Sequence, residues 1–447
     1  MREMGKLLQA RILFAIALAC LLLSSLTQQY LGHVSPSDAN IDFYVYYFAA
    51  QGVHDNPYAD LYAGAIDGNP QSLSAPTGST IFTHAKAAGI DDVQLYLYPP
   101  LLADLLAPFS RIPVHLAVTL WRAFNIALVF ASVLMLARIV RISILGFEFA
   151  VLALAAYSFF PVHEAIWIGQ ATIIMLALWT VGIAAYCEDR VILSAAAFAL
   201  ATAFKVTPIL LLPLFIIWKD RRWIISYFAV SLGLVSAMTV MNGLQNVSGS
   251  IEVISAMGSG IPSMANKTIG SLVAWIYYGK PFTPDTVLGV ISSQPCGLIF
   301  VAKAISGVFY LICLFLVWRG RRAGRATRAT TIAVFSLVTL CASPVSWRHG
   351  YSIAFIVLAI FWARALRTPT RVIHRVLLTV TTIVVGTVFL DAAAKTPAPQ
   401  VCKILLSASW IVFSVLFCLV TLYHVNTDGT EEQNGISPCK RQPSSVD

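Results

Sequence analysis

The sequence predicts an all-α polytopic membrane protein of about twelve transmembrane helices, with a re-entrant segment and external loop helices. Hydrophobic residues make up 58% of the 447 residues and charged residues only 11%, against about a quarter in soluble domains. Many apolar runs approach the roughly 17 to 25 residues that a spanning helix needs. Only helices and closed barrels satisfy the backbone in lipid, and these runs do not alternate, which excludes a barrel.

Short basic loops between the apolar runs set the predicted orientation. The formal net charge is +9, and much of it gathers at residues 219–222, 319–328 and 364–375. A nucleic-acid-binding protein would also be basic, but loops of this kind mark the cytoplasmic ends of membrane spans. The charge therefore predicts topology and excludes nucleic acid as a partner.

The first apolar run follows a basic start and precedes a long polar segment. We expect a span from about residue 12 to 31, inside to outside. Because so many spans follow, an uncleaved helix is favoured over a signal peptide. Residues 32–95 hold seven aspartates against one lysine, a net charge of −6. A long acidic loop after a basic N-terminus belongs outside, so this is the predicted first external loop.

Residues 94–110 are apolar but short. If they crossed, Arg138 and Arg141 at the end of the next span would lie outside. We therefore predict a re-entrant half-span on the outer side, where protein covers it. A second external loop is expected at 243–295. The other predicted spans are 114–137, 143–160, 166–186, 191–204, 206–218, 223–242, 296–318, 329–345, 350–366, 372–391 and 401–424.

Twelve crossings place both termini inside. We expect one transmembrane domain over residues 1–424 and a polar, disordered cytoplasmic tail over 425–447. The chain has no convincing internal repeat, which argues against the transporters that are built from inverted repeats.

The eight cysteines predict neither a disulfide framework nor a metal site. No Cys-x-x-Cys pair or His/Cys metal spacing occurs, and most of the cysteines lie in or beside apolar runs, where cysteine behaves as a small hydrophobe. No Gly-rich nucleotide fingerprint is present in a strand-to-helix setting. We expect no cofactor, although the first-loop aspartates leave a loosely bound divalent metal ion open.

Unusual polar residues gather on the predicted outer side, from segments far apart in the chain. Ionisable groups at membrane depth are costly, so their presence there suggests function. The residues concerned are Asp42, Tyr46, Tyr98, His163, Gln170, Lys205, Asn266, Lys267, Trp347, Arg348 and His349.

Three ionisable residues carry the functional hypothesis. Asp42 lies among aromatic and apolar neighbours, four residues before Tyr46 and on the same helical face. These surroundings favour a general base over a solvated carboxylate. Lys205, between two short apolar runs, either meets an anionic partner such as a lipid phosphate or snorkels to the interface. Arg348 breaks the positive-inside pattern and suits phosphate recognition; the alternative is a structural pair that holds its turn.

The remaining polar residues predict less. A lone histidine near an apolar face, such as His163, is more often structural. Gln170 could hydrogen-bond a sugar or join two helices. The tripeptide Asn266 to Thr268 fits the N-glycosylation pattern, which is common by chance, and we interpret it as part of a binding loop.

The order of these motifs resembles glycosyltransferase family 87 over roughly residues 10 to 390. Two departures concern the substrate more than the fold. The Gly-Gln turn is often followed by Val-Asn, but here by Ala171 and Thr172, and the last motif often ends in a His pair, while here His349 precedes Gly350. The motif residues are Asp42, Tyr46, Gly52, Tyr58, Tyr98 to Pro100, Gly169 and Gln170, Lys205 to Pro208, Asn266 to Thr268, and Ser343 to His349.

The resemblance implies a GT-C membrane fold and inverting transfer of a hexose, with mannose favoured. The donor would be a polyprenyl-monophosphate sugar and the acceptor a glycolipid or glycan. The family's base is the aspartate of the first external loop, here Asp42. We expect Lys205, Arg348 and His349 at the donor phosphate, on the extracytoplasmic face of the plasma (inner) membrane. The residues expected to contact substrate are Tyr46, Tyr98, His163, Gln170, Asn266, Lys267 and Trp347.

Three alternatives stay open. A transporter or flippase of lipid-linked sugars would also have many spans, but it does not need a long external loop with a helix-borne aspartate. A non-catalytic assembly subunit would tolerate changes at Asp42. An enzyme of the same architecture could instead attach sugar to protein or to lipid A.

Overall fold

The computed structural model is helical throughout the part of the chain that it describes. That part comprises residues 2–31, 40–63, 75, 77–91, 93–257, 263–280, 294–322, 324–368, 370–389, 393 and 399–427. Within it lie seventeen α-helices, three short 3₁₀ helices and no strand. Asn266 and Trp347 form an isolated antiparallel β-bridge.

Among the described residues, five helices are long and apolar enough to cross a membrane, and a pair bent by 59° makes a sixth candidate. This agrees with the predicted polytopic all-α membrane protein, while twelve crossings stay a prediction. The five are α1 (Arg2–Leu31), α5 (Val114–Ile139), α11 (Arg221–Met257), α14 (Cys296–Arg319) and α19 (Gln400–Thr427), and the bent pair is α6 (Phe147–Ser158) with α7 (Phe160–Trp167).

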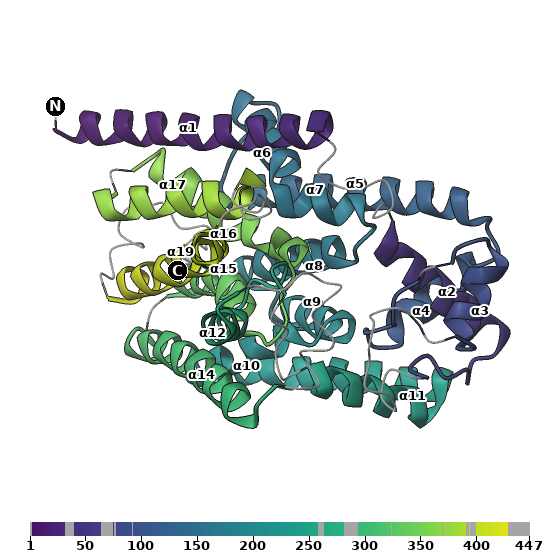
Figure 1. The fold of residues 1–447 in the computed structure, drawn as a ribbon. Helices are drawn as coiled ribbons and strands as arrows, with labels where there is room; N and C mark the ends of the chain where they lie inside the picture. The colour runs from purple at the N-terminus through teal and green to yellow at the C-terminus, as the bar shows by residue number, and fades with distance from the viewer. Residues whose placement is uncertain are drawn as a thin grey trace.

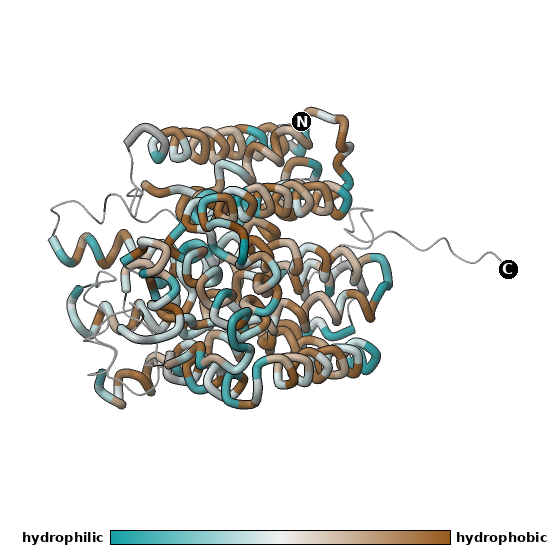
Figure 2. The backbone as a smooth tube through the Cα atoms, turned by 90° about the vertical axis from the view of Figure 1, so that its right-hand side faces the viewer, coloured by the Kyte–Doolittle hydropathy of each residue, from teal (hydrophilic) through white to brown (hydrophobic). Residues whose placement is uncertain are grey.

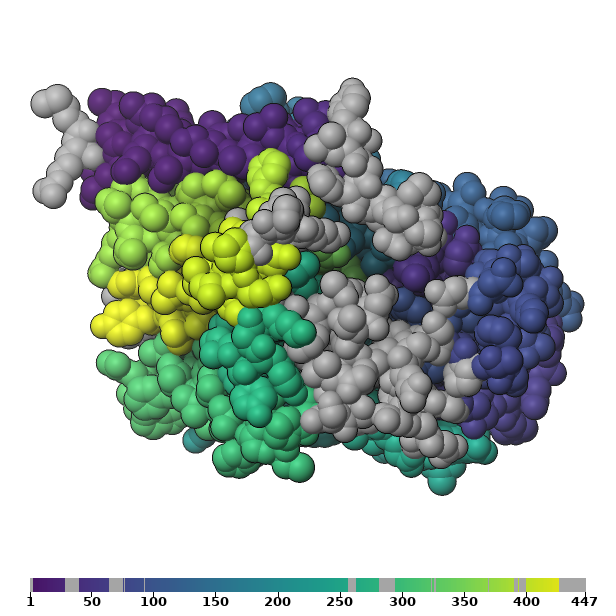
Figure 3. Space-filling view, in the orientation of Figure 1, coloured from purple at the N-terminus to yellow at the C-terminus, as the bar shows by residue number. Residues whose placement is uncertain are grey.

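Shorter helices fill the interior and one end. In Figure 1, α1 lies along one side beside α17, and α14 and α11 lie along the opposite side. The helices α2, α3 and α4 gather at one end of the molecule, where they also form part of the surface in Figure 3. The bounds are α2 (Ile41–Asp55), α3 (Thr80–Ala87), α4 (Leu101–Leu106), α8 (Thr172–Cys187), α9 (Val191–Phe204), α10 (Leu212–Ile217), α12 (Ile269–Tyr278), α15 (Arg325–Ala342), α16 (Ala354–Ala365) and α17 (Val372–Gly386).

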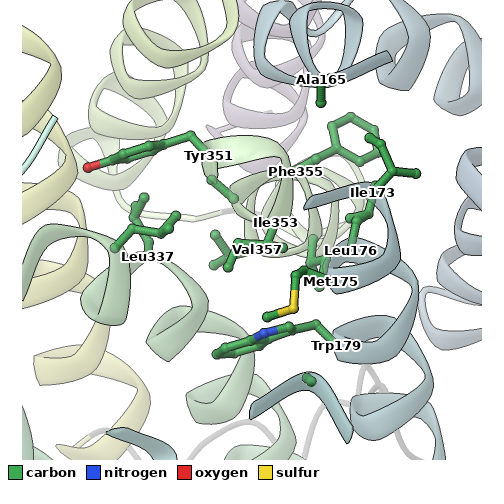
Figure 4. Packing of buried hydrophobic residues seen from close by; sticks show 14 of the residues in the cluster. Ala165, Ile173, Met175, Leu176, Trp179, Leu337, Tyr351, Ile353, Phe355 and Val357 are labelled. Carbon is green, nitrogen blue, oxygen red and sulfur yellow. The ribbon is translucent and has the colours of Figure 1, made fainter. Parts of the chain in front are cut away.

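The apolar residues form one continuous core. Figure 2 shows hydrophobic stretches along most helices, with hydrophilic residues concentrated at helix ends and loops. In Figure 4, α8 contributes Trp179 and Met175, which face Leu337 of α15 and Val357 of α16. Trp179 is fully buried and meets the ring of Phe198 on α9 edge to face at 5.2 Å. This packing fixes α8 and α9, which carry two of the functional turns.

The structure departs from the predicted boundaries near residue 160. We expected His163 and Glu164 at a turn between two spans, but they lie on α7. The apolar run is interrupted at Phe159, which is extended (φ −71, ψ 113), and α7 restarts with Pro161 in its first turn, where proline is tolerated.

Two other predicted boundaries lie elsewhere in the structure, and the segment 94–110 is helical only in part. The helix α11 runs on into the predicted second external loop, although Gly243 (φ 76, ψ 161) breaks its geometry at the end of the predicted span. The segment 94–110 holds only α4 and the 3₁₀ helix η2 (Ala107–Phe109), too short to cross as helices. The predicted tail lies outside the described residues from 428 onward, since α19 continues to Thr427.

Candidate active site

The first turn of α2 is tied to the end of α7. The amides of Asn40 and Asp42 donate to the carbonyls of Trp167 and Ile168, each at 3.1 Å, and the amide of Phe43 donates to Ile168 at 3.4 Å. The first amides of a helix have no partner within it, and here another helix terminus supplies the acceptors. Asp42 is therefore held in a defined position relative to the turn after α7.

That turn requires glycine. Gly169 has φ +75, a conformation that side chains rarely adopt. A Cβ atom added there would lie 2.5 Å from Cβ of Phe43, so α2 approaches the turn too closely for any larger residue. Trp121 of α5 donates its indole N–H to the Gly169 carbonyl at 2.7 Å. Three helices thus meet at this residue.

Gln170, the next residue, gathers the polar groups of the site. Its side-chain oxygen accepts from the Tyr46 hydroxyl at 2.6 Å and from the Tyr98 hydroxyl at 3.0 Å. The backbone amide of Ala171 also donates to this oxygen, at 2.9 Å. The amide nitrogen of Gln170 remains to donate to the Asp42 carboxylate. The structure therefore brings together four of the predicted site residues.

The Asp42 carboxyl lies outside the candidate spans and has a shifted pKa. Burial raises the pKa of Asp42 to about 7, and the negative charge of Glu164 acts in the same direction. The hydrogen bond from Gln170 and the positive charge of Lys205 lower it. A general base works best when its pKa is near the operating pH, so the site suits Asp42 for proton removal.

Lys205 lies at the break between α9 and the 3₁₀ helix η3 (Thr207–Leu211), close enough to Asp42 for the two charges to interact. Lys205 is the C-cap residue of α9, and its backbone is extended (φ −155, ψ 121). A Cβ atom at Gly350 would lie 3.7 Å from its ammonium nitrogen, so the lysine points to the 3₁₀ helix η4 (Arg348–Ile353). Burial lowers the pKa of Lys205 to about 8, against the opposing effect of Asp42.

A pocket of about 270 Å³ opens beside this lysine. Lys205 supplies its cationic group, and apolar and aromatic side chains make up most of the remaining wall. This combination fits a ligand with an anionic head and an apolar body. The lining includes Tyr98, Lys205, Ile209, Ile254, Pro344 and Trp347.

Arg348 is paired across the site with an acid to which the sequence analysis gave no role. Its guanidinium donates to the Glu164 carboxylate at 2.6 Å, and the side chains are only 20% and 8% exposed. Arg348 also lies over the ring of Phe160, 5.5 Å from its centre. The pair joins η4 to α7. It is the kind of structural pair that the sequence analysis gave as the alternative role of Arg348.

His349 is buried beside both cations. Burial, Lys205 and Arg348 together hold the pKa of His349 well below its usual value, so the imidazole is neutral. Its Nε2 atom has no hydrogen-bond partner among the described residues. A neutral imidazole in this position can bind a hydroxyl or a phosphate oxygen.

The Asn266 loop shapes this wall of the site. Asn266 accepts from the Ser346 amide at 2.6 Å and donates to the Pro344 carbonyl at 3.2 Å, while the Lys267 amide donates to the Ser346 carbonyl at 2.8 Å. Asn266 and Lys267 are fully buried. The loop thereby positions Trp347.

Lys267 and His163 point elsewhere. The Lys267 ammonium lies 5.3 Å from the ring centre of Trp410 and 5.9 Å from that of Trp275. His163 packs edge to face on Tyr157 at 6.0 Å. Neither is among the groups that perturb Asp42. No group of three His, Cys, Asp or Glu residues in the described part of the chain could hold a metal ion.

Two comparisons with known proteins bear on this site. A comparison with curated proteins returned no match. The sequence model of glycosyltransferase family 87 matches residues 96–344, more than half of the chain. The match includes Tyr98, Gln170 and Lys205, whereas Asp42 and Arg348 lie outside it, so their placement rests on the structure. The chain belongs to glycosyltransferase family 87.

Proposed function

We propose that this glycosyltransferase moves a hexose, with mannose favoured, from a polyprenyl-monophosphate sugar to a hydroxyl of a glycolipid or glycan. The reaction inverts the anomeric centre, and Asp42 is the general base. The site faces the outer side of the plasma (inner) membrane, and the chain forms a GT-C-type bundle of about twelve spans.

One observation carries this proposal. The Asp42 carboxylate, with its pKa raised to about 7, lies close enough to Lys205 for the two charges to interact, and an apolar pocket opens beside that lysine. A lipid phosphate needs a cation and an apolar wall, and a hydroxyl nucleophile needs a base. Asp42, Lys205 and the pocket beside Lys205 meet these two requirements in one region of the molecule.

The transfer is a single displacement. The acceptor hydroxyl oxygen attacks the anomeric carbon while the bond from that carbon to the phosphate oxygen breaks. Asp42 takes the hydroxyl proton, and polyprenyl monophosphate leaves with the electron pair of the broken bond. The leaving phosphate needs charge stabilisation rather than a strong acid, and Lys205 supplies it.

Other residues position the substrates. The Asp42 carboxylate is held in place by Tyr46, Tyr98 and Gln170. These three side chains also form the surface that the acceptor hydroxyl contacts. His349 offers its Nε2 to the phosphate or the acceptor. Trp347 contributes to the donor pocket.

Some residues act only indirectly. Arg348 contributes to the phosphate site through the pair with Glu164, which holds η4 in place. Asn266 and Lys267 act through the loop that they support, and His163 through the packing of α7.

The decisive experiment uses purified protein in detergent with a radiolabelled polyprenyl-phosphate mannose donor and a glycolipid acceptor. We expect Asp42→Asn to lower kcat by about 10²- to 10⁴-fold, because a positioned base is typically worth that factor. The matched control is Asp91→Asn, an exposed aspartate of the same loop, which should retain full activity.

Two outcomes would contradict the proposal. Turnover by the Asp42→Asn protein at the rate of the Asp91→Asn protein removes Asp42 from the role of base. Failure of the wild-type protein to consume the donor in detergent, where no gradient exists, favours a transporter, a flippase or an assembly subunit.

A further inference from the structure

A second pocket lies on the side of the bundle that α1 covers. It encloses about 620 Å³ between α1, α6, α16 and α17, helices that lie near one another in Figure 1. Apolar and aromatic side chains dominate its walls. Examples are Phe14, Leu18, Leu152, Phe355, Leu358 and Trp362.

The walls of this pocket are fixed, because α17 holds α1 at two places. Near one end of α1, the Arg375 guanidinium donates to the Lys6 carbonyl at 2.7 Å and to the Gln9 side chain at 2.8 Å. Farther along, a Cβ atom at Gly386 would lie 2.5 Å from the Leu21 side chain. Because these contacts hold α1 against the bundle, the space between α1 and α16 is a fixed cavity.

Charged groups lie at one end of the pocket. Its lining includes Arg11, Glu148 and Arg367, two positive charges against one negative charge. Arg367 is anchored, since its guanidinium donates to the carbonyls of Val140 and Arg141 at the end of α5. Arg11 is exposed. From Arg367 to Phe355 the wall extends roughly 18 Å at 1.5 Å per helical residue.

This charged end is remote from the Asp42 cavity. Trp121 of α5 contacts Gly169 beside Asp42, whereas Arg367 contacts Val140 at the other end of the same helix. Nineteen residues separate Trp121 from Val140, roughly 28 Å along the axis. The second pocket is thus separate from the site that contains Lys205.

We propose that this pocket binds an anionic phospholipid, with an acyl chain along the apolar wall and the phosphate between Arg11 and Arg367. Arginine recognises phosphate oxygens through two parallel hydrogen bonds, and basic pockets between membrane helices bind anionic headgroups. The excess of one positive charge selects an anionic lipid over a zwitterionic one.

The test measures lipid retention by native mass spectrometry of the full-length protein in detergent. The probes are phosphatidylglycerol, phosphatidylcholine with the same chains, and inorganic phosphate. We expect one phosphatidylglycerol to be retained in preference to phosphatidylcholine. Arg11→Gln should weaken retention about five-fold, since one basic residue near an anionic headgroup contributes about that factor. The exposed Arg222→Gln on α11 is the matched charge control and should change nothing.

A second pair of variants tests the apolar wall. Ala359→Trp fills the pocket and should abolish retention, whereas Ile12→Trp, on the exposed face of α1, should not. Equal retention of the two phospholipids, equal behaviour of Arg11→Gln and Arg222→Gln, or normal retention by Ala359→Trp would each overturn the proposal. Displacement of the lipid by equimolar inorganic phosphate would instead identify a site for a free anion and overturn it as well.

Discussion

The two cations of the candidate site, Arg348 and Lys205, are held in different ways. On the α7 side, Arg348 is joined to Glu164 at 2.6 Å. On the α9 side, no carboxylate of the described residues lies within ion-pair distance of Lys205, which lines the 270 Å³ pocket. We infer from this contrast that Arg348 has a structural role and that Lys205 is left to bind a ligand.

The largest effect that tests this contrast is expected at Lys205. Replacing it with glutamine removes the charge that we propose meets the leaving phosphate, so kcat should fall by about 10²- to 10³-fold, as when one transition-state donor is lost. Steady-state kinetics with the lipid donor would measure the change. Lys86→Gln, an exposed lysine of α3, should behave as wild type. A rise in KM alone would assign Lys205 to binding only.

A smaller effect on turnover is expected at Arg348, together with a loss of stability. Arg348→Gln leaves the Glu164 charge buried without its main partner, and breaking a buried pair in this way costs about 3 kcal/mol or more. Thermal unfolding in detergent should show a lowered midpoint. The double variant with Glu164→Gln should recover most of the loss. If the single variant is as stable as wild type but inactive, Arg348 acts on the phosphate directly.

The smallest effect is a shift in pH dependence. The rate kcat/KM should fall below pH 7, where Asp42 takes up a proton, and above pH 8, where Lys205 loses one. Glu164→Gln removes a negative charge that raises the pKa of Asp42, so the acid limb should move to lower pH while the alkaline limb stays. A pH–rate profile of the folded variant provides the measurement, and an unmoved acid limb would assign that limb to another group.

Much of the fold could be predicted because the length of an apolar run and the proline or glycine that ends it are local features of the sequence. The predicted span 191–204 coincides with α9, and Pro208 marks the break after Lys205. The helix α7 was missed because its polar residues His163 and Glu164 favour a turn in the sequence, although both lie on a helix. The helix α11 kinks at Gly243, where the predicted span ends. Beyond Gly243 the sequence lacks the continuous apolar run that would have indicated further helix.

The site was predictable by residue type but not by pairing. Asp42, Tyr46, Tyr98 and Gln170 converge as expected, because unusual polar residues in apolar surroundings seldom lack a role. The partner of Arg348 could not be foreseen, since Glu164 is 184 residues away in sequence. For the same reason, nothing in the chain indicated that Asn266 would align with Trp347.

The tie between α7 and α2 has a consequence for how this chain can change over time. Asp42 is set in place by the carbonyls of Trp167 and Ile168 and by the contact of Phe43 with Gly169. Inserting or deleting one residue in that short stretch would rotate the carboxylate away from the cavity. Among related sequences, insertions and deletions should therefore occur elsewhere, for example in the exposed turn at Asp189. They should be rare between Trp167 and Gln170.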